Sequence, residues 1–196
     1  MTTRSFLFLL AGARADGNTE LLARTAAEQL PAGAGQRWLD LTRLHLPDFT
    51  DERHAADAPR AESADETLLR EATLAATDIV IVSPLYWYSL SSYAKRYLDH
   101  WSRWLRTPDP GFRAAMAGGT LWGVTAMAHS EPEVAAPLTL TLHHTAAYLR
   151  MRFGGVLLGT ASSPGQIRAD TAALTRAKTF FATEAPLARF PYEEEA

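Results

Sequence analysis

The chain has 196 residues, enough to bury a sizeable core, and a formal net charge of −3. It has no basic stripe, so nothing indicates a nucleic-acid partner. It contains no cysteine, which excludes disulfides, iron–sulfur clusters and zinc–thiolate sites, and we predict no metal site. No apolar run approaches transmembrane length, so we expect no membrane partner.

The N-terminal region predicts a strand, a loop of small residues and a helix. Residues 6–10 are all apolar, and residues 18–30 have a helical pattern. Between them, Gly12 and Gly17 let the backbone approach a ligand, and Arg14 adds a cation. Because unpaired N–H groups at a helix N-terminus favour an anion, this segment is a candidate phosphate cradle. An ordinary strand-to-helix turn has the same composition, so the pattern alone leaves both interpretations open.

The same region also imitates a minimal secretory signal peptide. Arg4 precedes the apolar run, and residues 13–15 follow it as Ala-Arg-Ala. The run is at the short limit for a signal peptide, and its removal would delete the first strand. We therefore expect a cytoplasmic protein, which the absence of cysteine also fits.

Strand and helix patterns alternate along the rest of the chain. Further strands are predicted at 37–41, 79–83, 120–125 and 155–158. Further helices are predicted at 62–76, 89–106, 131–150 and 170–184. Five strand–helix units with this spacing predict a three-layer α/β/α sandwich. We expect one domain over residues 1–190, followed by an acidic tail at 191–196.

Two loops and one helix start carry further expectations. Residues 42–61 form a long polar segment of a kind that is usually functional or mobile. Its histidines, His45 and His54, either border a substrate mouth or lie on the surface. Ser130 and Glu133 form a predicted capping box, and Pro137 should kink or restart the helix that follows.

The segment after the third predicted strand is the most informative part of the chain. Residues 79–83 read as a strand buried on both faces, which is typical of a parallel sheet. Where a polar turn is expected, the sequence instead gives Pro84, Leu85, Tyr86, Trp87 and Tyr88. Ligands of open α/β sheets sit beyond the carboxyl ends of the strands. A planar aromatic ligand would account for this loop.

Two motifs resemble the flavodoxin-like NADPH-dependent FMN reductase family, which includes related flavin-dependent quinone reductases. Residues 11–19, AGARADGNT, resemble the family's phosphate loop G-S-x-R-x-x-G-N-T. The second motif, x-P-x-Y-W-x-S-x-x-x-x-x-K-x-x-x-D, is met by Pro84, Tyr86, Trp87, Ser89, Lys95 and Asp99. The order of elements extends the similarity over nearly the whole chain.

This resemblance implies a flavodoxin-like fold with a five-stranded parallel sheet in the order 2-1-3-4-5. It implies FMN at the carboxyl ends of strands one, three and four, and NAD(P)H as co-substrate. The flavin-binding residues implied by position are Gly12, Arg14, Asn18, Thr19, Pro84, Leu85, Tyr86, Trp87, Tyr88, Ser89, Thr125 and Met127. FMN is expected rather than FAD, because the phosphate loop should close around a terminal monophosphate.

The chain departs from the family pattern at two places. Ala11 and Gly12 replace a Gly-Ser pair, which removes one hydroxyl contact to the phosphate. The loop at 125–129 reads TAMAH and lacks the glycine-rich turn of many members. His129 in this loop is the candidate catalytic residue, as a donor to a quinone oxygen or to the flavin; the alternative is an exposed loop histidine. The iron–sulfur branch is excluded, because its cysteines are missing.

The leading functional prediction is an FMN-dependent NAD(P)H oxidoreductase that passes electrons to a quinone or a similar small planar acceptor. Flavin carries the electron chemistry itself, so no acid–base residue is strictly required. One alternative is a flavodoxin-type electron carrier, although carriers tend to be shorter and strongly acidic. Another is a flavin-free binding module, which the missing hydroxyl at Gly12 keeps open.

The predicted helix at 89–106 carries two apolar stripes. The first, expected to face the sheet, contains Leu90, Ala94, Leu98, Trp101 and Leu105. The second contains Tyr93, Tyr97, His100 and Trp104. We expect the second stripe to meet either the helix at 131–150 or a second subunit, in a homodimer built around the helices at 89–106 and 131–150. The loop with Phe112 and Met116 is another possible cover, and His143 and His144 are ordinary helix residues.

Overall fold

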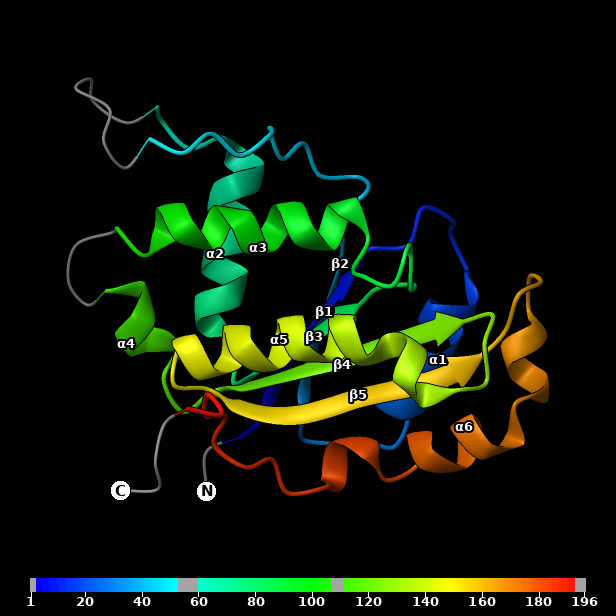
Figure 1. Ribbon diagram of the computed structural model, residues 1–196. Helices are drawn as coiled ribbons and strands as arrows, with labels where there is room; N and C mark the ends of the chain where they lie inside the picture. The colour runs from blue at the N-terminus through cyan, green and yellow to red at the C-terminus, as the bar shows by residue number, and fades with distance from the viewer. Residues whose placement is uncertain (1–2, 53–59, 107–110, 193–196) are drawn as a thin grey trace.

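The computed structural model describes residues 3–52, 60–106 and 111–192 and contains one five-stranded sheet (Figure 1). The strands are β1 (Ser5–Leu10), β2 (Gly35–Asp40), β3 (Asp78–Val82), β4 (Thr120–Met127) and β5 (Arg152–Thr160). All neighbouring pairs are parallel, in the order β2-β1-β3-β4-β5. The predicted fold class and strand order are therefore confirmed, and the apolar run near the N-terminus is a central strand.

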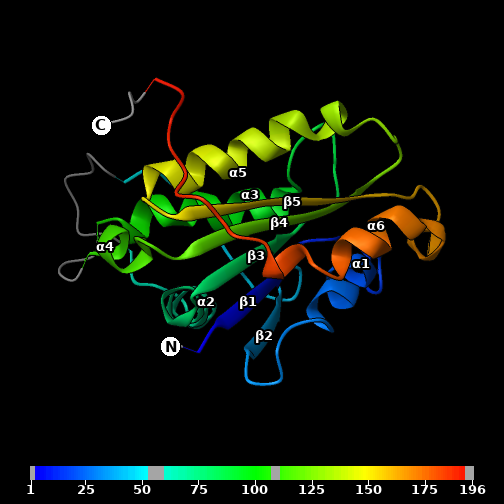
Figure 2. The same ribbon diagram turned by 90° about the horizontal axis from the view of Figure 1, so that it is seen from below.

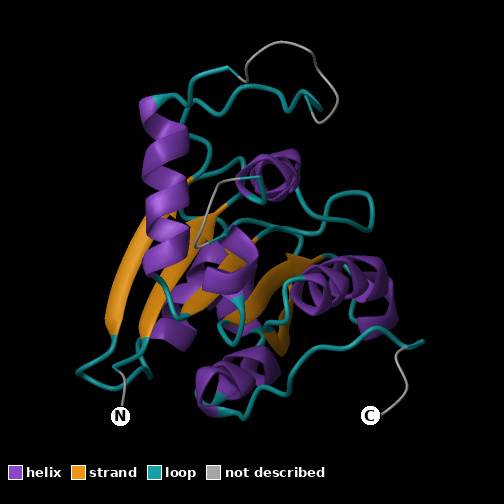
Figure 3. Cartoon of the chain, turned by 90° about the vertical axis from the view of Figure 1, so that its left-hand side faces the viewer, coloured by secondary structure: helices purple, strands orange, loops and turns teal. Residues whose placement is uncertain are grey.

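Helices cover both faces of the sheet, as Figures 2 and 3 show. The α-helices are α1 (Asn18–Ala27), α2 (Ala64–Ala75), α3 (Ser92–Trp104), α4 (Phe112–Met116), α5 (Ala136–Tyr148) and α6 (Thr171–Ala177). Short 3₁₀ turns are η1 (Pro132–Ala135), η2 (Gln166–Ala169) and η3 (Phe180–Ala182). Helices α2, α3 and α5 pack on one face, and α1 and α6 pack on the other. No helix in the described ranges is long and apolar enough to cross a bilayer.

The alternation of side chains along β1 explains the two cores. Leu7 and Leu9 belong to the core beneath α2, α3 and α5, whereas Phe6 and Phe8 belong to the core beneath α1 and α6. Successive side chains of a strand point to opposite faces, so an entirely apolar run fills both cores. The uninterrupted hydrophobicity of this run therefore specifies a central strand.

Several predicted element boundaries need correction. The helix predicted at 131–150 begins as η1, and Pro137 lies in the first turn of α5, so the expected restart is confirmed. The capping box of Ser130 and Glu133 is wrong, because Glu131 is the N-cap residue of η1 and no side chain caps it among the described residues. The helix predicted at 170–184 divides into α6 and η3, and the short helix α4 was not predicted.

The second stripe of α3 is largely core, which corrects the idea that it forms a subunit interface. Tyr97, His100 and Trp104 are all buried within the chain. Trp104 packs against Phe112 of α4 at a ring-centroid distance of 5.6 Å. The Tyr97 hydroxyl lies 2.7 Å from the Thr73 hydroxyl of α2. Helices α2 and α4 cover this stripe, so it cannot serve as a contact with another subunit.

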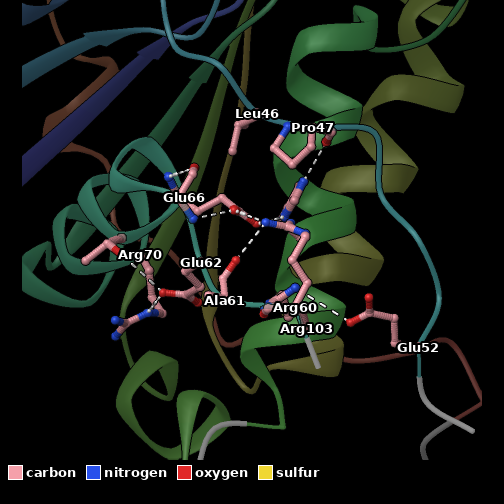
Figure 4. Close-up of polar contacts among 12 residues, drawn as sticks. Leu46, Pro47, Glu52, Arg60, Ala61, Glu62, Glu66, Arg70 and Arg103 are labelled. Atoms are coloured by element: carbon pink, nitrogen blue, oxygen red, sulfur yellow. Dashed lines mark hydrogen bonds and ion pairs between the residues drawn. The ribbon is translucent and has the colours of Figure 1, made fainter. Parts of the chain in front are cut away.

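The long loop between β2 and α2 is fastened to α3 by polar contacts (Figure 4). Arg96 donates to the carbonyl oxygen of Leu46 at 3.2 Å, and His100 Nε2 lies 3.0 Å from that of Pro47. Arg103 pairs with Glu52 and donates to the carbonyl oxygen of Arg60. The described parts of the loop are therefore packed against the body of the protein. His54 lies outside the described residues, and His45 is exposed.

Glu66 of α2 lies at the centre of the contacts that hold this loop against α2 and α3. Its fully buried carboxylate accepts two hydrogen bonds from Arg60, both at 2.7 Å, and one from the Ser63 backbone N–H at 2.8 Å. His100 Nδ1 lies 3.2 Å from Glu66 Oε1. Burial acts to raise the pKa of Glu66, but the hydrogen bonds from Arg60 and Ser63, with the charges of Arg60 and His100, outweigh it and lower the pKa to about 2. The carboxylate is therefore ionised at neutral pH.

Candidate functional site

A cavity of about 800 Å³ opens at the carboxyl ends of the strands. It is lined by the loops after β1, β3, β4 and β5 and by the end of β2. In Figure 1 the loops after β1, β3 and β4 gather at one end of the sheet. This is where ligands of open α/β sheets bind. The two loops singled out from the sequence therefore belong to one cavity.

Most of the predicted site residues line this cavity. The predicted residues in its wall are Gly12, Arg14, Asn18, Thr19, Pro84, Leu85, Tyr86 and Met127. The predicted residues outside its wall are Trp87, Tyr88, Ser89, Thr125 and His129. The geometry thus brings the phosphate loop and the start of the aromatic loop together, but gives no support for flavin contacts from the second group.

The loop after β1 leaves the N-terminus of α1 open. Gly17 is the N-cap residue, and none of the described side chains caps the helix. Asp16 has a φ of +53°, and its backbone N–H donates to Glu20 Oε2 at 3.1 Å, which fixes the turn. A Cβ on Gly17 would approach the Arg14 carbonyl oxygen to 3.2 Å, so a side chain there would crowd the loop. With the exposed Arg14 on the wall, this open helix end suits an anion.

Asn18 and Thr19 tie α1 to neighbouring loops. The Asn18 amide donates to the Ser163 carbonyl oxygen at 2.9 Å, and its oxygen accepts from the Ile167 N–H at 3.3 Å. The Thr19 hydroxyl oxygen accepts from the Ala126 N–H at 3.2 Å, which leaves the hydroxyl hydrogen available for a ligand. Both residues therefore position the cradle, and Thr19 retains a donor that could reach a phosphate.

The loop after β3 forms a closed two-residue turn. The Tyr86 N–H donates to the Ser89 carbonyl oxygen at 3.1 Å, and the Ser89 N–H donates to that of Tyr86 at 3.0 Å. Trp87 and Tyr88 occupy the two central positions with φ of +48° and +65°. Tyr86 lines the cavity, whereas the Trp87 side chain is 93% exposed. The turn thus places one ring on the cavity wall and the next in solvent.

The loop after β4 contributes backbone more than side chains. Residues 126–128 line the cavity, and Met127 is buried. The Thr125 side chain is fully buried, and its hydroxyl has no hydrogen-bond partner among the described residues. His129 is exposed, and its Nδ1 lies 4.0 Å from Glu131 Oε2. That position corresponds to the exposed loop histidine of the alternative interpretation.

Sequence reasoning missed the cavity walls at β2 and β5. Trp38, Asp40 and Arg43 line the cavity on the β2 side, and Ala161 and Ser162 line it after β5. The strand order alone could have found the first group, because the end of β2 lies beside that of β1. Nothing in the composition of the second group distinguishes it from an ordinary loop.

The charges on the β2 side are paired with one another. Arg24 contacts Glu20 at 2.6 Å, and Arg43 contacts Asp40 at 3.1 Å. The Arg24 guanidinium also lies 4.4 Å from the Trp38 ring centroid. Arg14 lines the cavity and is the arginine nearest in sequence to the open end of α1, so it is the candidate cation for an anion at that helix end. The described residues contain no group of three or more acidic or histidine side chains that could hold a metal ion.

The donor set and shape of the cavity fit FMN. The open helix end and Arg14 can hold a phosphate, and the apolar wall formed by Pro84, Leu85 and Tyr86 can edge a planar ring system. Both features lie in one cavity, as a molecule with a phosphate and an aromatic ring requires. The geometry therefore supports a phosphorylated aromatic cofactor.

Comparison with known proteins gives a consistent result. The family model described as "Flavodoxin-like fold" matches residues 4–179. The chain is 30% identical over 168 residues to the Bacillus subtilis protein YwqN, whose name describes an NAD(P)H-dependent FMN-containing oxidoreductase. That match covers 85% of this chain and 90% of the relative.

Solved structures show the same fold. The Trp repressor binding protein from Bacillus subtilis superposes with a TM-score of 0.71 at 23% identity, covering 91% of this chain and 98% of the other. An NAD(P)H:quinone oxidoreductase from Methanothermobacter marburgensis superposes with a TM-score of 0.69 at 17% identity, covering 90% and 94%. At these identities the likeness concerns the fold alone.

Proposed function

The chain belongs to the family with the flavodoxin-like fold, and from that premise we propose that it is an FMN-dependent NAD(P)H oxidoreductase. It passes electrons to a quinone or a similar small planar acceptor. The observation that carries the proposal is that one cavity is lined both by an open helix N-terminus with Arg14 and by apolar and aromatic residues. The name of the YwqN relative, at 30% identity, supports the same activity.

FMN, when bound, carries hydride from the nicotinamide and electrons to the acceptor. The chain's residues bind and orient it. Arg14 and the N–H groups of the first turn of α1 hold the phosphate. Tyr86 and Leu85 border the ring, and Met127 completes the wall on the β4 side. Backbone N–H groups beside the ring would stabilise the negative charge of the reduced cofactor.

An NAD(P)H-consumption assay in air, with FMN and with or without an added naphthoquinone, tests this proposal. We expect NAD(P)H oxidation that depends on FMN and accelerates with the quinone. Because both substrates use one face of the ring, double-reciprocal plots should be parallel. Bound FMN without any NAD(P)H oxidation would favour an electron carrier, and absence of FMN binding would favour a flavin-free module.

We also propose a homodimer through α3 and α5, although not through the stripe first expected. Residues 134–149 contain no Asp, Glu, Lys or Arg, and Leu140 and Tyr148 of α5 are about half-exposed. A groove of about 320 Å³ runs between the two helices, with Leu98 of α3 and its C-cap residue Leu105 in the wall. A helix without charges is unusual on a solvated surface, so a partner of the same kind would cover it.

Leu140→Glu tests the dimer, with Leu74→Glu on α2 as the matched control. Light scattering should show a dimer for the wild type and the control, and a monomer for Leu140→Glu, with unchanged circular dichroism. A wild-type monomer at micromolar concentrations would contradict the proposal. We further propose a cytoplasmic location, where NAD(P)H is available, and a single functional domain over residues 1–190.

A further inference from the structure

We propose that Arg43, oriented by Asp40, selects NADPH over NADH by binding the 2′-phosphate on the adenosine ribose of the dinucleotide. The inference rests on the proposed function, which brings a nicotinamide dinucleotide into the cavity without fixing which of the two it is. Three features of the β2 side of the cavity support it: the place of that wall, the contacts of Asp40 and the free end of Arg43.

The cavity has a wall at β2 that lies away from the residues assigned to the flavin ring. β2 is the edge strand beside β1, and Trp38, Asp40 and Arg43 line the cavity there. Residues 84–86, which border the ring in the proposed function, follow β3 on the other side of β1. Adjacent strands lie about 4.8 Å apart, so the ends of β2 and β3 are about 10 Å from each other. A dinucleotide with its nicotinamide on the flavin ring can therefore lay its adenosine half along the β2 wall.

Asp40 stands where many dinucleotide-binding sheets place an acid, at the end of the second strand. In such sheets the acid accepts the ribose 2′-hydroxyl of NAD, whereas a nearby arginine accommodates the 2′-phosphate of NADP. Here both carboxylate oxygens have partners within the chain. Oδ1 accepts from the Thr42 N–H at 2.9 Å and from the Thr42 hydroxyl at 2.7 Å, and Oδ2 lies 3.1 Å from Arg43 Nε. Asp40 is therefore a positioning residue for Arg43.

The pairing with Asp40 leaves the end of the Arg43 side chain available. Its closest contact with the carboxylate is through Nε, and its two Nη atoms form no hydrogen bond with any described residue. The side chain is 79% exposed, so a ligand in the cavity can reach it. A guanidinium with free terminal N–H groups binds a phosphate through two parallel hydrogen bonds. NADH has a hydroxyl at this place and gains no such pair.

The other arginines that line the described cavity have different tasks. Arg24 donates through Nε and Nη2 to Glu20 Oε1, at 2.9 and 2.6 Å, and its guanidinium lies 4.4 Å from the Trp38 ring centroid. Arg14 is the candidate for the FMN phosphate, beside the open end of α1. A second phosphate in the same cavity is therefore left to Arg43.

Steady-state kinetics of Arg43→Ala, with the protein loaded with FMN and a naphthoquinone as acceptor, test the inference. The wild type should use NADPH better than NADH. Arg43→Ala should lower the NADPH-to-NADH ratio of kcat/KM about tenfold or more, as expected for loss of a charge-assisted hydrogen bond of about 1.5 kcal/mol. The loss should appear in the KM for NADPH. Arg37→Ala, an exposed arginine of β2 outside the cavity wall, is the control.

Two further variants separate orientation from charge. Arg43→Lys keeps the positive charge but loses the planar pair of donors, so it should retain only part of the preference for NADPH. Asp40→Asn should also lower the NADPH-to-NADH ratio. Because Asp40 acts through Arg43, adding Asp40→Asn to Arg43→Ala should lower the ratio no further.

Three outcomes would overturn the inference. The first is a wild type that uses NADH as well as NADPH, or better. The second is a ratio that Arg43→Ala leaves unchanged, which would make Arg43 an ordinary surface residue. The third is an FMN dissociation constant that rises about tenfold in Arg43→Ala, a loss of about 1.4 kcal/mol, which would assign Arg43 to the flavin.

A binding measurement separates this inference from the proposed function. Calorimetry should show that the FMN-loaded wild type binds adenosine 2′,5′-bisphosphate more tightly than adenosine 5′-monophosphate, and that Arg43→Ala loses this difference. If the wild type oxidises neither dinucleotide but the difference depends on Arg43, the proposed function fails and the phosphate site stands. If turnover is normal and the difference is absent or independent of Arg43, the phosphate site fails alone.

Discussion

The loops that follow β2 and β3 use their side chains in opposite ways. The loop after β2 is long and charged, and Glu66, Arg60 and His100 fasten it to α2 and α3. The loop after β3 is short and aromatic, and it leaves Trp87, the residue after Tyr86 of the cavity wall, almost fully exposed. Length and charge therefore do not indicate which loop keeps its side chains exposed in this protein. The two loops differ in the partners that the fold gives to their side chains.

The largest effect is expected for Glu66→Ala, which removes the central contact of the loop between β2 and α2. It removes a buried carboxylate with three hydrogen bonds, one of which completes the capping box of α2, so the free energy of unfolding should fall by about 3 kcal/mol. Urea denaturation measures the loss. The control is Glu62→Ala, whose partly exposed pair with Arg70 should be worth about 1 kcal/mol or less. Equal losses in the two variants would mean that Glu66 does not organise the loop.

Lowering the pH should also weaken the contacts of Glu66, because it protonates the carboxylate. The folded-state pKa of Glu66 is about 2, below its ordinary 4.5, so its stabilising contribution is complete above about pH 4.5 and is lost as the pH falls toward 2. Unfolding free energies measured across this range should decline more steeply for the wild type than for Glu66→Gln. Parallel curves for the two proteins would refute a dominant role of Glu66 in acid sensitivity.

Arg14→Ala tests the contribution of a cavity residue to FMN binding. Loss of a charge-assisted contact to the phosphate should weaken FMN binding by about 1.5–3 kcal/mol, with little effect on riboflavin, which lacks the phosphate. Because Arg14 is exposed, stability should change by less than about 0.5 kcal/mol. Arg37→Ala, an exposed arginine of β2 outside the cavity wall, is the control. Equal losses for FMN and riboflavin would show that Arg14 does not touch the phosphate.

The smallest expected effects on stability come from removing one hydroxyl from the core around α3 and one from the cavity wall. Tyr97→Phe deletes a buried hydrogen bond to Thr73, so it should cost about 1 kcal/mol of stability and leave acceptor kinetics unchanged. Tyr86→Phe, on the cavity wall, should alter stability by less than about 0.5 kcal/mol. Thermal denaturation of both variants checks this, and a larger loss at Tyr86 would contradict the division of roles.

The fold was predictable because its signals are local and strong. The apolar run of β1 and the strand-to-helix spacing specify a parallel sheet whatever the details of the loops. Helix ends were less predictable: the 3₁₀ turn η1 at Pro132–Ala135 takes the place of a capped first turn. Trp104 is covered by Phe112 of α4, a segment that the sequence offered only as one alternative cover, because a five-residue helix is too short to leave a periodic pattern.

The candidate site was predictable where residues close together in the sequence line the same cavity. The candidate phosphate loop and Tyr86 both line the cavity, and their role in binding FMN stays a prediction. Trp38 could have been inferred from the expected strand order, which puts the end of β2 beside that of β1, whereas Ser162 lies in a loop whose composition carries no signal. The exposure of Trp87 depends on a two-residue turn with positive φ at Trp87 and Tyr88. Such turns favour glycine or asparagine, and the sequence has neither at these positions, so it did not predict the turn.

Anaerobic addition of NADPH to the protein with stoichiometric FMN tests the central claim most directly. The proposed function predicts that the protein turns yellow on binding FMN, that NADPH bleaches the visible flavin absorbance, and that a naphthoquinone restores it. Arg14→Ala should show the same cycle only at higher FMN concentration. Flavin that binds but stays oxidised with excess NADPH and with excess NADH would contradict the oxidoreductase assignment.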